Sequence, residues 1–93
     1  MQLNKQRCEL RLSEKSDWEL FESMAQKIVS DFSGTITKKL DRLDQRYWDM
    51  KIGDVGVTLH LEHYLGIFLF PAKGFEDNPA AKELIEKIAE KYA

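Results

Sequence analysis

The chain has 93 residues, of which 43% are hydrophobic and 32% are charged, and its formal net charge is −2. This size and composition suit one globular domain over residues 1–93, and the acidic balance disfavours a general nucleic-acid binder, which usually has a basic face. The sequence has no apolar run that could cross a membrane, no apolar signal-peptide core near its N-terminus and a single cysteine, so we expect a cytoplasmic protein.

The first predicted element is a strand over residues 7–12. Apolar and charged residues alternate there, and successive side chains of a strand point to opposite faces. Cys8, Leu10 and Leu12 therefore share one face, which we expect to be buried.

The second predicted element is a helix over residues 17–32. Its apolar residues recur at helical spacing and form one continuous stripe. Ser16 and Glu19 match a capping box with Ser16 at the N-cap. Gly34 stands where a left-handed glycine ends many helices. The sequence thus predicts both ends of this helix.

Residues 35–45 have an ambiguous pattern. Their β-branched start favours a strand, whereas the spacing of Ile36, Leu40 and Leu43 also fits a helical turn. We expect a short strand over residues 35–40, followed by a loop.

The stretch 46–70 alternates throughout and predicts a three-stranded antiparallel meander. A two-residue turn at 53–54 would pair Trp48 with Leu59 and bring both onto the face that forms the core.

A second two-residue turn, at 64–65, would continue the meander. It would place Phe68 and Phe70 on the same core face. Ile67 and Leu69 would then lie on the opposite, outer face of the sheet.

The last predicted element is a helix that begins at Asn78 as N-cap and Pro79 as first helical residue. The element order is therefore β-α-β-β-β-β-α. Two helices with one apolar stripe each can cover one face of a sheet. The predicted fold is an α+β two-layer sandwich, with an antiparallel sheet of about four or five strands and both helices on one face.

One cluster has residue types that bind metals, namely His60, Glu62 and His63. His60 and Glu62 would share the outer face, but His63 would lie in the turn or point to the other side. Because a catalytic zinc site usually needs three protein ligands, we expect no bound metal and no cofactor. A metal- or small-molecule-binding protein that uses this cluster is the alternative hypothesis.

The outer face also combines two aliphatic side chains with aromatic and polar ones. No predicted segment is left to cover it, and aromatic residues are enriched at protein interfaces. We therefore predict a partner-binding surface formed by Tyr47, His60, Ile67 and Leu69.

A group of basic residues precedes and begins the meander, with aspartates interleaved. We interpret it as a solvated loop, and a docking patch for an acidic partner is the alternative. The basic residues are Lys38, Lys39, Arg42 and Arg46.

Part of the chain resembles a small bacterial domain family of unknown function. The resemblance rests on Trp48, the Leu-His-Leu of residues 59–61 and the Tyr-Leu-Gly-Ile-Phe-Leu of residues 64–69, together with the preceding amphipathic helix. It covers residues from about Phe21 to Ile88. Such a family implies no activity, so it assigns no site residue.

The sequence shows no strong catalytic or cofactor motif. Our leading hypothesis is a small non-enzymatic module that binds another protein or itself, for example as a homodimer, and that binds neither nucleic acid nor membrane.

Overall fold

The computed structural model describes residues 1–92. The elements are β1 (Gln2–Asn4), β2 (Glu9–Ser13), α1 (Trp18–Phe32), β3 (Thr35–Asp41), β4 (Gln45–Ile52), β5 (Val55–Glu62), β6 (Gly66–Pro71) and α2 (Pro79–Tyr92). Within this described part, neither helix has the length and apolar character needed to cross a membrane.

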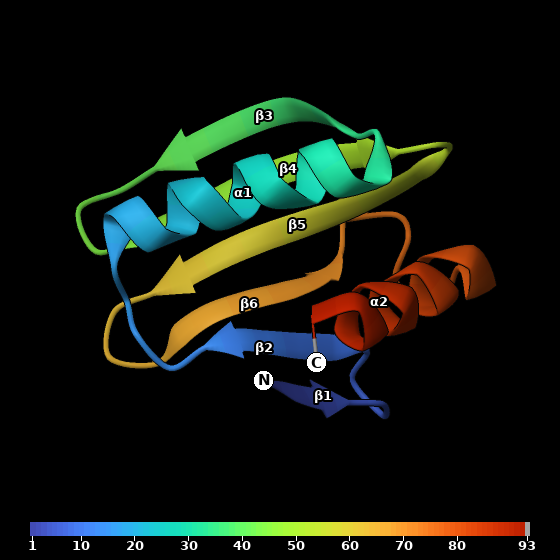
Figure 1. The fold of residues 1–93 in the computed structure, drawn as a ribbon, viewed down its shortest axis with the longest axis horizontal. Coiled ribbons are helices and arrows are strands. Elements are labelled where there is room, and N and C mark those ends of the chain that lie inside the picture. The colour runs from blue at the N-terminus through green and yellow to red at the C-terminus, as the bar shows by residue number, and fades with distance from the viewer. Residues whose placement is uncertain (93) are drawn as a thin grey trace.

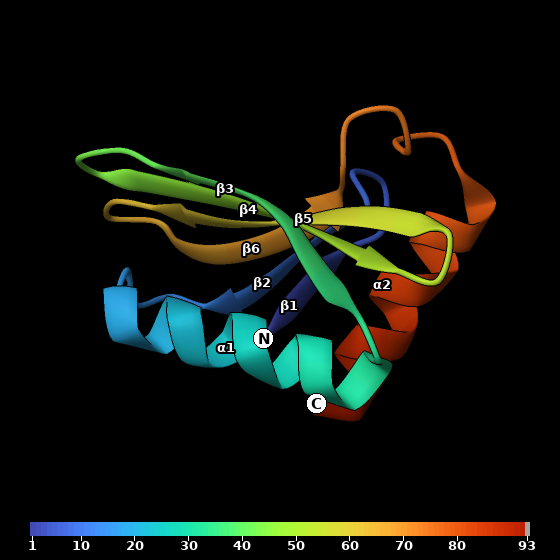
Figure 2. The ribbon, with the colours of Figure 1, turned by 90° about the horizontal axis from the view of Figure 1, so that it is seen from above.

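The six strands form one antiparallel sheet in the order β1-β2-β6-β5-β4-β3. Both helices lie on one side of it (Figure 1), and an edge-on view shows no helix on the other side (Figure 2). The predicted α+β class is confirmed. The predicted four or five strands and the predicted element order are wrong because the chain begins with β1, which is too short to show an alternating pattern.

The turn between β4 and β5 has the predicted register. Trp48 pairs with Leu59, and Ile52 pairs with Val55. Gly53 has a φ of 61°, and a positive φ at the first central position is what two-residue hairpin turns require. The ambiguous segment is extended and pairs with β4 as strand β3, so its strand interpretation is confirmed.

The turn between β5 and β6 differs from the prediction. It contains three residues, 63–65, and the Leu65 amide donates a 3.1 Å hydrogen bond to the Glu62 carbonyl. Tyr64 is left-handed, with a φ of 73°. Since tyrosine rarely adopts this conformation, the sequence carried no signal for the additional turn residue.

This extra residue exchanges the two faces of β6. Ile67 and Leu69 are 0% exposed and lie in the core, where they pair with Leu61 and Leu59. Phe68 and Phe70 lie on the outer face instead. Both placements are the reverse of the prediction.

Helix α1 begins one residue later than predicted. The Asp17 carboxylate accepts a 2.9 Å hydrogen bond from the Leu20 amide and caps the helix. The Ser16 hydroxyl instead donates to the Glu62 carbonyl at 2.8 Å. The capping box at Ser16 is therefore wrong, and Ser16 ties the chain before α1 to the end of β5.

The end of α1 also departs from the prediction. Ser33, with a φ of 54°, is the left-handed residue that terminates the helix. Gly34 is not left-handed; its amide donates a 2.9 Å hydrogen bond to the Val29 carbonyl. Helix α2, by contrast, begins as predicted, because the Asn78 side chain accepts a 2.8 Å hydrogen bond from the Ala80 amide.

The core lies between the helices and the inner face of the sheet. Its members come from the strands that alternate in sequence and from the apolar stripes of both helices, as predicted for all of them except those of β6. They are Cys8, Leu10, Leu12, Phe21, Ala25, Ile28, Trp48, Met50, Ile52, Val57, Leu59, Leu61, Ile67, Leu69, Ala81, Ile85 and Ile88. Cys8 is buried as predicted but lies in the turn before β2, with a φ of 50°, so the predicted strand over residues 7–12 began two residues too early.

Arg46 is buried at the start of β4 and is only 4% exposed. Its guanidinium group lies 4.4 Å from the ring centroid of Trp18 and 4.6 Å from that of Trp48. Asp41 accepts hydrogen bonds from its Nε at 2.9 Å and its Nη2 at 3.3 Å. The interpretation of Arg46 as part of a solvated basic loop is therefore wrong.

Candidate functional site: the outer face of the sheet

The outer face is the side of the sheet that no helix covers (Figure 2). It is formed by the alternate residues of each strand that do not enter the core. On β2, β4, β5 and β6 the larger ones are Glu9, Arg11, Tyr47, Asp49, Lys51, Thr58, His60, Glu62, Phe68 and Phe70.

Four of these side chains form a row across four neighbouring strands, which we call the aromatic row: Tyr47, His60, Phe68 and Arg11. Tyr47 lies opposite His60, His60 opposite Phe68, and Phe68 opposite Arg11. The rings of Tyr47 and His60 stack with centroids 4.1 Å apart and planes 15° apart. The Arg11 guanidinium lies 5.5 Å from the Phe68 ring centroid. The row is thus a continuous strip with a cation at one end.

A second row lies beside it and carries two carboxylates; we call it the acidic row. Thr58 lies opposite both Asp49 and Phe70, and its hydroxyl donates a 2.7 Å hydrogen bond to Asp49. Glu9 continues the row next to Phe70, with which it lines a shallow hollow of about 230 Å³. The Phe70 ring stands edge-on to His60, with centroids 6.0 Å apart.

His60 is the titratable group at the centre of the outer face. Burial lowers its pKa from the usual value, while the nearby carboxylates of Glu62 and Glu9 oppose that shift. Its Nε2 atom is buried and has no hydrogen-bond partner among residues 1–92. An imidazole held between Tyr47 and two phenylalanine rings is best accommodated in its uncharged form.

We expect acidification to destabilise the fold through His60. Because the pKa of His60 is lower in the folded state than in the unfolded state, the unfolded chain binds more protons as the pH falls below about 6.5. The stability that depends on neutral His60 is present at higher pH and is lost as the pH falls through the folded pKa. Urea unfolding between about pH 7.5 and 5.5 should show a smaller loss of stability in His60→Gln than in the native protein. Equal losses would contradict the expectation.

The alternative metal cluster is not assembled. His60 lies on the outer face between aromatic rings, and His63 lies in the turn against Tyr64, with ring centroids 3.9 Å apart. Glu62 is the last residue of β5. Among residues 1–92, no three His, Cys, Asp or Glu side chains are grouped so that they could hold a metal ion.

Of the four side chains predicted to bind a partner, Tyr47 and His60 lie together on the outer face, whereas Ile67 and Leu69 are in the core. Sequence reasoning missed Phe68 and Phe70. Both faces of β6 are apolar, so alternation could not say which one is inside.

The comparison with protein families agrees with the sequence resemblance. A family model described as "Protein of unknown function (DUF3630)" matches residues 1–89, a longer stretch than the one on which the resemblance rested. No curated protein matches the chain, and no solved structure matches it.

Proposed function

We propose that this chain, which belongs to the family of proteins of unknown function DUF3630, is a non-enzymatic module that associates with a second copy of itself through the outer face of its sheet. The observation that carries the proposal is the placement of the aromatic row directly beside the acidic row. Together they form a half-buried aromatic surface with opposite charges at one edge.

The two rows are complementary to each other under a two-fold axis. In an isologous interface, residue i meets residue j and residue j meets residue i. If the axis runs across the strands between the two rows, Arg11 faces Glu9 of the second copy. Phe68 then faces Phe70 of the second copy, and aromatic side chains meet in the middle of the interface.

The size and shape of the outer face also suit a second copy. The molecule measures 32 × 25 Å along its two longer axes, and the sheet lies in that plane (Figure 1). The face therefore offers at most on the order of 800 Å², because α2 extends beyond the sheet in this view. About 800 Å² is what one partner contributes to a stable interface. The connection between β6 and α2 rises above this face at one end (Figure 2). The proposed axis places the two copies of that connection at opposite ends, where they do not collide.

A charge exchange tests the proposed arrangement. Arg11→Glu would set two carboxylates against each other at each of the two symmetric contacts, and we expect the dimer to weaken by about tenfold or more. Glu9→Arg should weaken it similarly. The double variant Arg11→Glu with Glu9→Arg should restore dimerisation because it rebuilds both contacts with the charges exchanged. Sedimentation equilibrium of the four proteins would measure these dissociation constants.

The control variant is Lys87→Glu, which makes the same change of charge on α2, where Lys87 pairs with Glu83 and not with the outer face. Its dissociation constant should match that of the native protein. A native protein that stays monomeric at about 1 mM would refute the proposal. A double variant as weak as the single ones would refute the proposed axis.

A further inference from the structure

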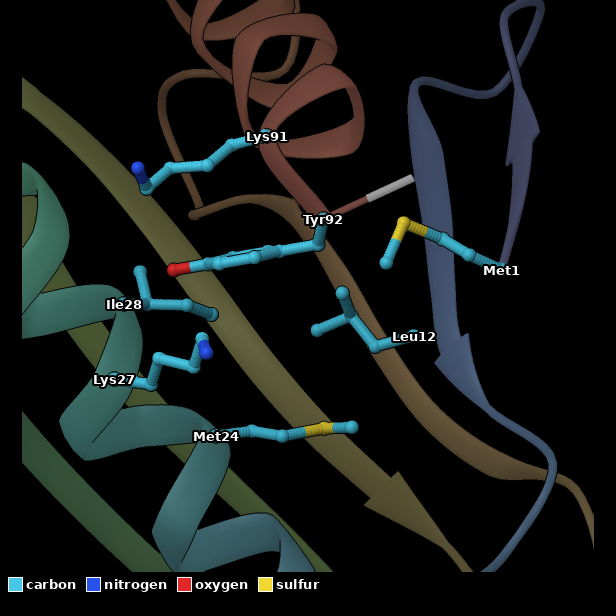
Figure 3. Close-up of a pocket in the computed structure, with 7 residues that line it drawn as sticks. All are labelled: Met1, Leu12, Met24, Lys27, Ile28, Lys91 and Tyr92. Atoms are coloured by element: carbon cyan, nitrogen blue, oxygen red, sulfur yellow. The ribbon is translucent and has the colours of Figure 1, made fainter.

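A groove lies between α1 and α2 (Figure 3), and both helices are on the side of the sheet opposite to the outer face (Figure 2). Its volume is about 400 Å³, within the range of small-molecule sites. Its lining residues come from both helices, from β2 and from the N-terminus. They are Met1, Leu12, Met24, Lys27, Ile28, Lys91 and Tyr92.

The groove exists because the helices cover different parts of the sheet. Helix α1 packs mainly on β4 and β5, whereas α2 packs on β6, β5 and β2. The end of β2 is left between them, and Leu12 and Ile28 form an apolar base that is 8% and 1% exposed. Met1 and Met24 complete the walls (Figure 3). Methionine side chains adapt easily to the shape of an apolar ligand.

The charged side chains that line the groove have one sign. Lys27 and Lys91 carry its charged side chains, and the N-terminal ammonium belongs to a third lining residue, Met1. Neither lysine forms an ion pair with a carboxylate among residues 1–92. The Asp31 carboxylate lies next to the groove, where it accepts a 2.8 Å hydrogen bond from the Tyr92 hydroxyl. The Lys27 ammonium lies 5.5 Å from the Tyr92 ring centroid. An apolar base with two available ammonium groups complements a ligand that has an apolar body and an anionic head.

We propose that this groove binds a single-chain anionic amphiphile, with the chemistry of a medium-chain fatty carboxylate. Its hydrocarbon chain would lie between Met1 and Met24, above the buried Leu12 and Ile28, where the apolar surface of the chain itself leaves water. Its carboxylate would accept a charge-assisted, and therefore strong, hydrogen bond from Lys27 or Lys91, whose ammonium groups lie on different sides of the Tyr92 ring (Figure 3). This site is independent of the self-association surface, because the groove is lined by the helices, β2 and the N-terminus, and the helices lie on the side of the sheet away from the outer face (Figure 2).

Methionine methyl groups give a direct readout of binding. The chain has three methionines: Met1 and Met24 line the groove, whereas Met50 is 1% exposed in the core. Decanoate, added below its micelle concentration to protein with ¹³C-labelled methionine methyl groups, should shift the Met1 and Met24 signals and leave Met50 unchanged. Signals that do not move, or that all move together, would overturn the proposal.

Matched ligands and variants test the role of the two lysines. The double variant Lys27→Gln with Lys91→Gln should bind decanoate at least about tenfold more weakly, because it loses the charge-assisted contacts. Its affinity for 1-decanol, which has no charge, should be unchanged. Both lysines are exposed, so the variant should fold, and circular dichroism would check this.

Equal affinity of the native protein and the double variant for decanoate would overturn the assignment of the anionic head. Equal affinity of the native protein for decanoate and decyltrimethylammonium would do the same. Binding to anionic phospholipid vesicles without any binding of free decanoate would show that the groove recognises a membrane surface, and would also overturn the proposal.

Discussion

Replacement of Gly66 by alanine should destabilise the fold by about 3 kcal/mol or more. For a domain of this size, that corresponds to a fall in melting temperature of at least about 12 °C. Thermal unfolding followed by circular dichroism would measure it. A loss of this size is a large part of the total stability expected for a domain of about 100 residues.

Two independent effects combine at this position. Gly66 has a φ of 119°, a conformation that side-chain-bearing residues rarely adopt. A methyl group there would also overlap the backbone carbonyl oxygen of Ser13 and would come within 3.0 Å of the Cα atom of Glu14. Neither obstacle is the end of a flexible side chain, so the connection from β2 towards α1 would have to move.

Gly74→Ala separates the two effects. Gly74 also has a positive φ, 94°, but no atom lies within 4 Å of the position that a Cβ would occupy. We expect this control to lose only the conformational part, about 1–2 kcal/mol. If Gly66→Ala were no more destabilising than Gly74→Ala, the close approach of Ser13 to Gly66 would be absent in solution.

Gly66 also explains why the face of β6 could not be predicted from the sequence. The correct register depends on Tyr64, which has a left-handed conformation, and on Gly66. Because Gly66 has no side chain, the backbone of Ser13 and Glu14 can pass close to it. Both are tertiary features. The hydrophobic pattern could not identify the buried face of β6 either, because Ile67 and Leu69 are as apolar as Phe68 and Phe70.

The elements with an unambiguous alternation were predicted well. Core-facing apolar residues alternate with outer-face residues along β4 from Tyr47 onward and along β5, and a glycine marks the turn between the two strands. The positions of Trp48, Leu59 and His60 therefore followed directly. The candidate site was therefore half predictable: the part on β4 and β5 was, and the part on β6 was not. Strand β1 could not be predicted because three residues are too few to show a period.

The placement of Arg46 was also predicted wrongly from the sequence. Its charge led to the interpretation of a solvated residue, yet alternation in β4 points it to the core face together with Trp48. The charge is tolerated there because Asp41 pairs with the guanidinium and the Trp18 carbonyl accepts a 3.2 Å hydrogen bond from Nη1. Glu22 adds a carboxylate 3.5 Å from Nη1. These contacts fasten β4 to both β3 and α1.

We expect Arg46→Ala to cost about 2–5 kcal/mol, mainly because it leaves a cavity between aromatic rings. The Asp41 side chain is 42% exposed, so the ion pair is buried only on the arginine side. Arg46→Met should lose less, since it keeps the volume while removing the charge.

The pKa of Asp41 is lowered chiefly by its hydrogen bond from Arg46. The stabilisation from this pair is therefore present above the unfolded carboxylate pKa of about 3.9 and is lost as the pH falls through the folded value. Urea unfolding at neutral and acidic pH should show this acid-dependent loss in the native protein and a smaller one in Arg46→Met. An Arg46→Ala variant within about 1 kcal/mol of the native protein would mean that the guanidinium group is not held between the rings.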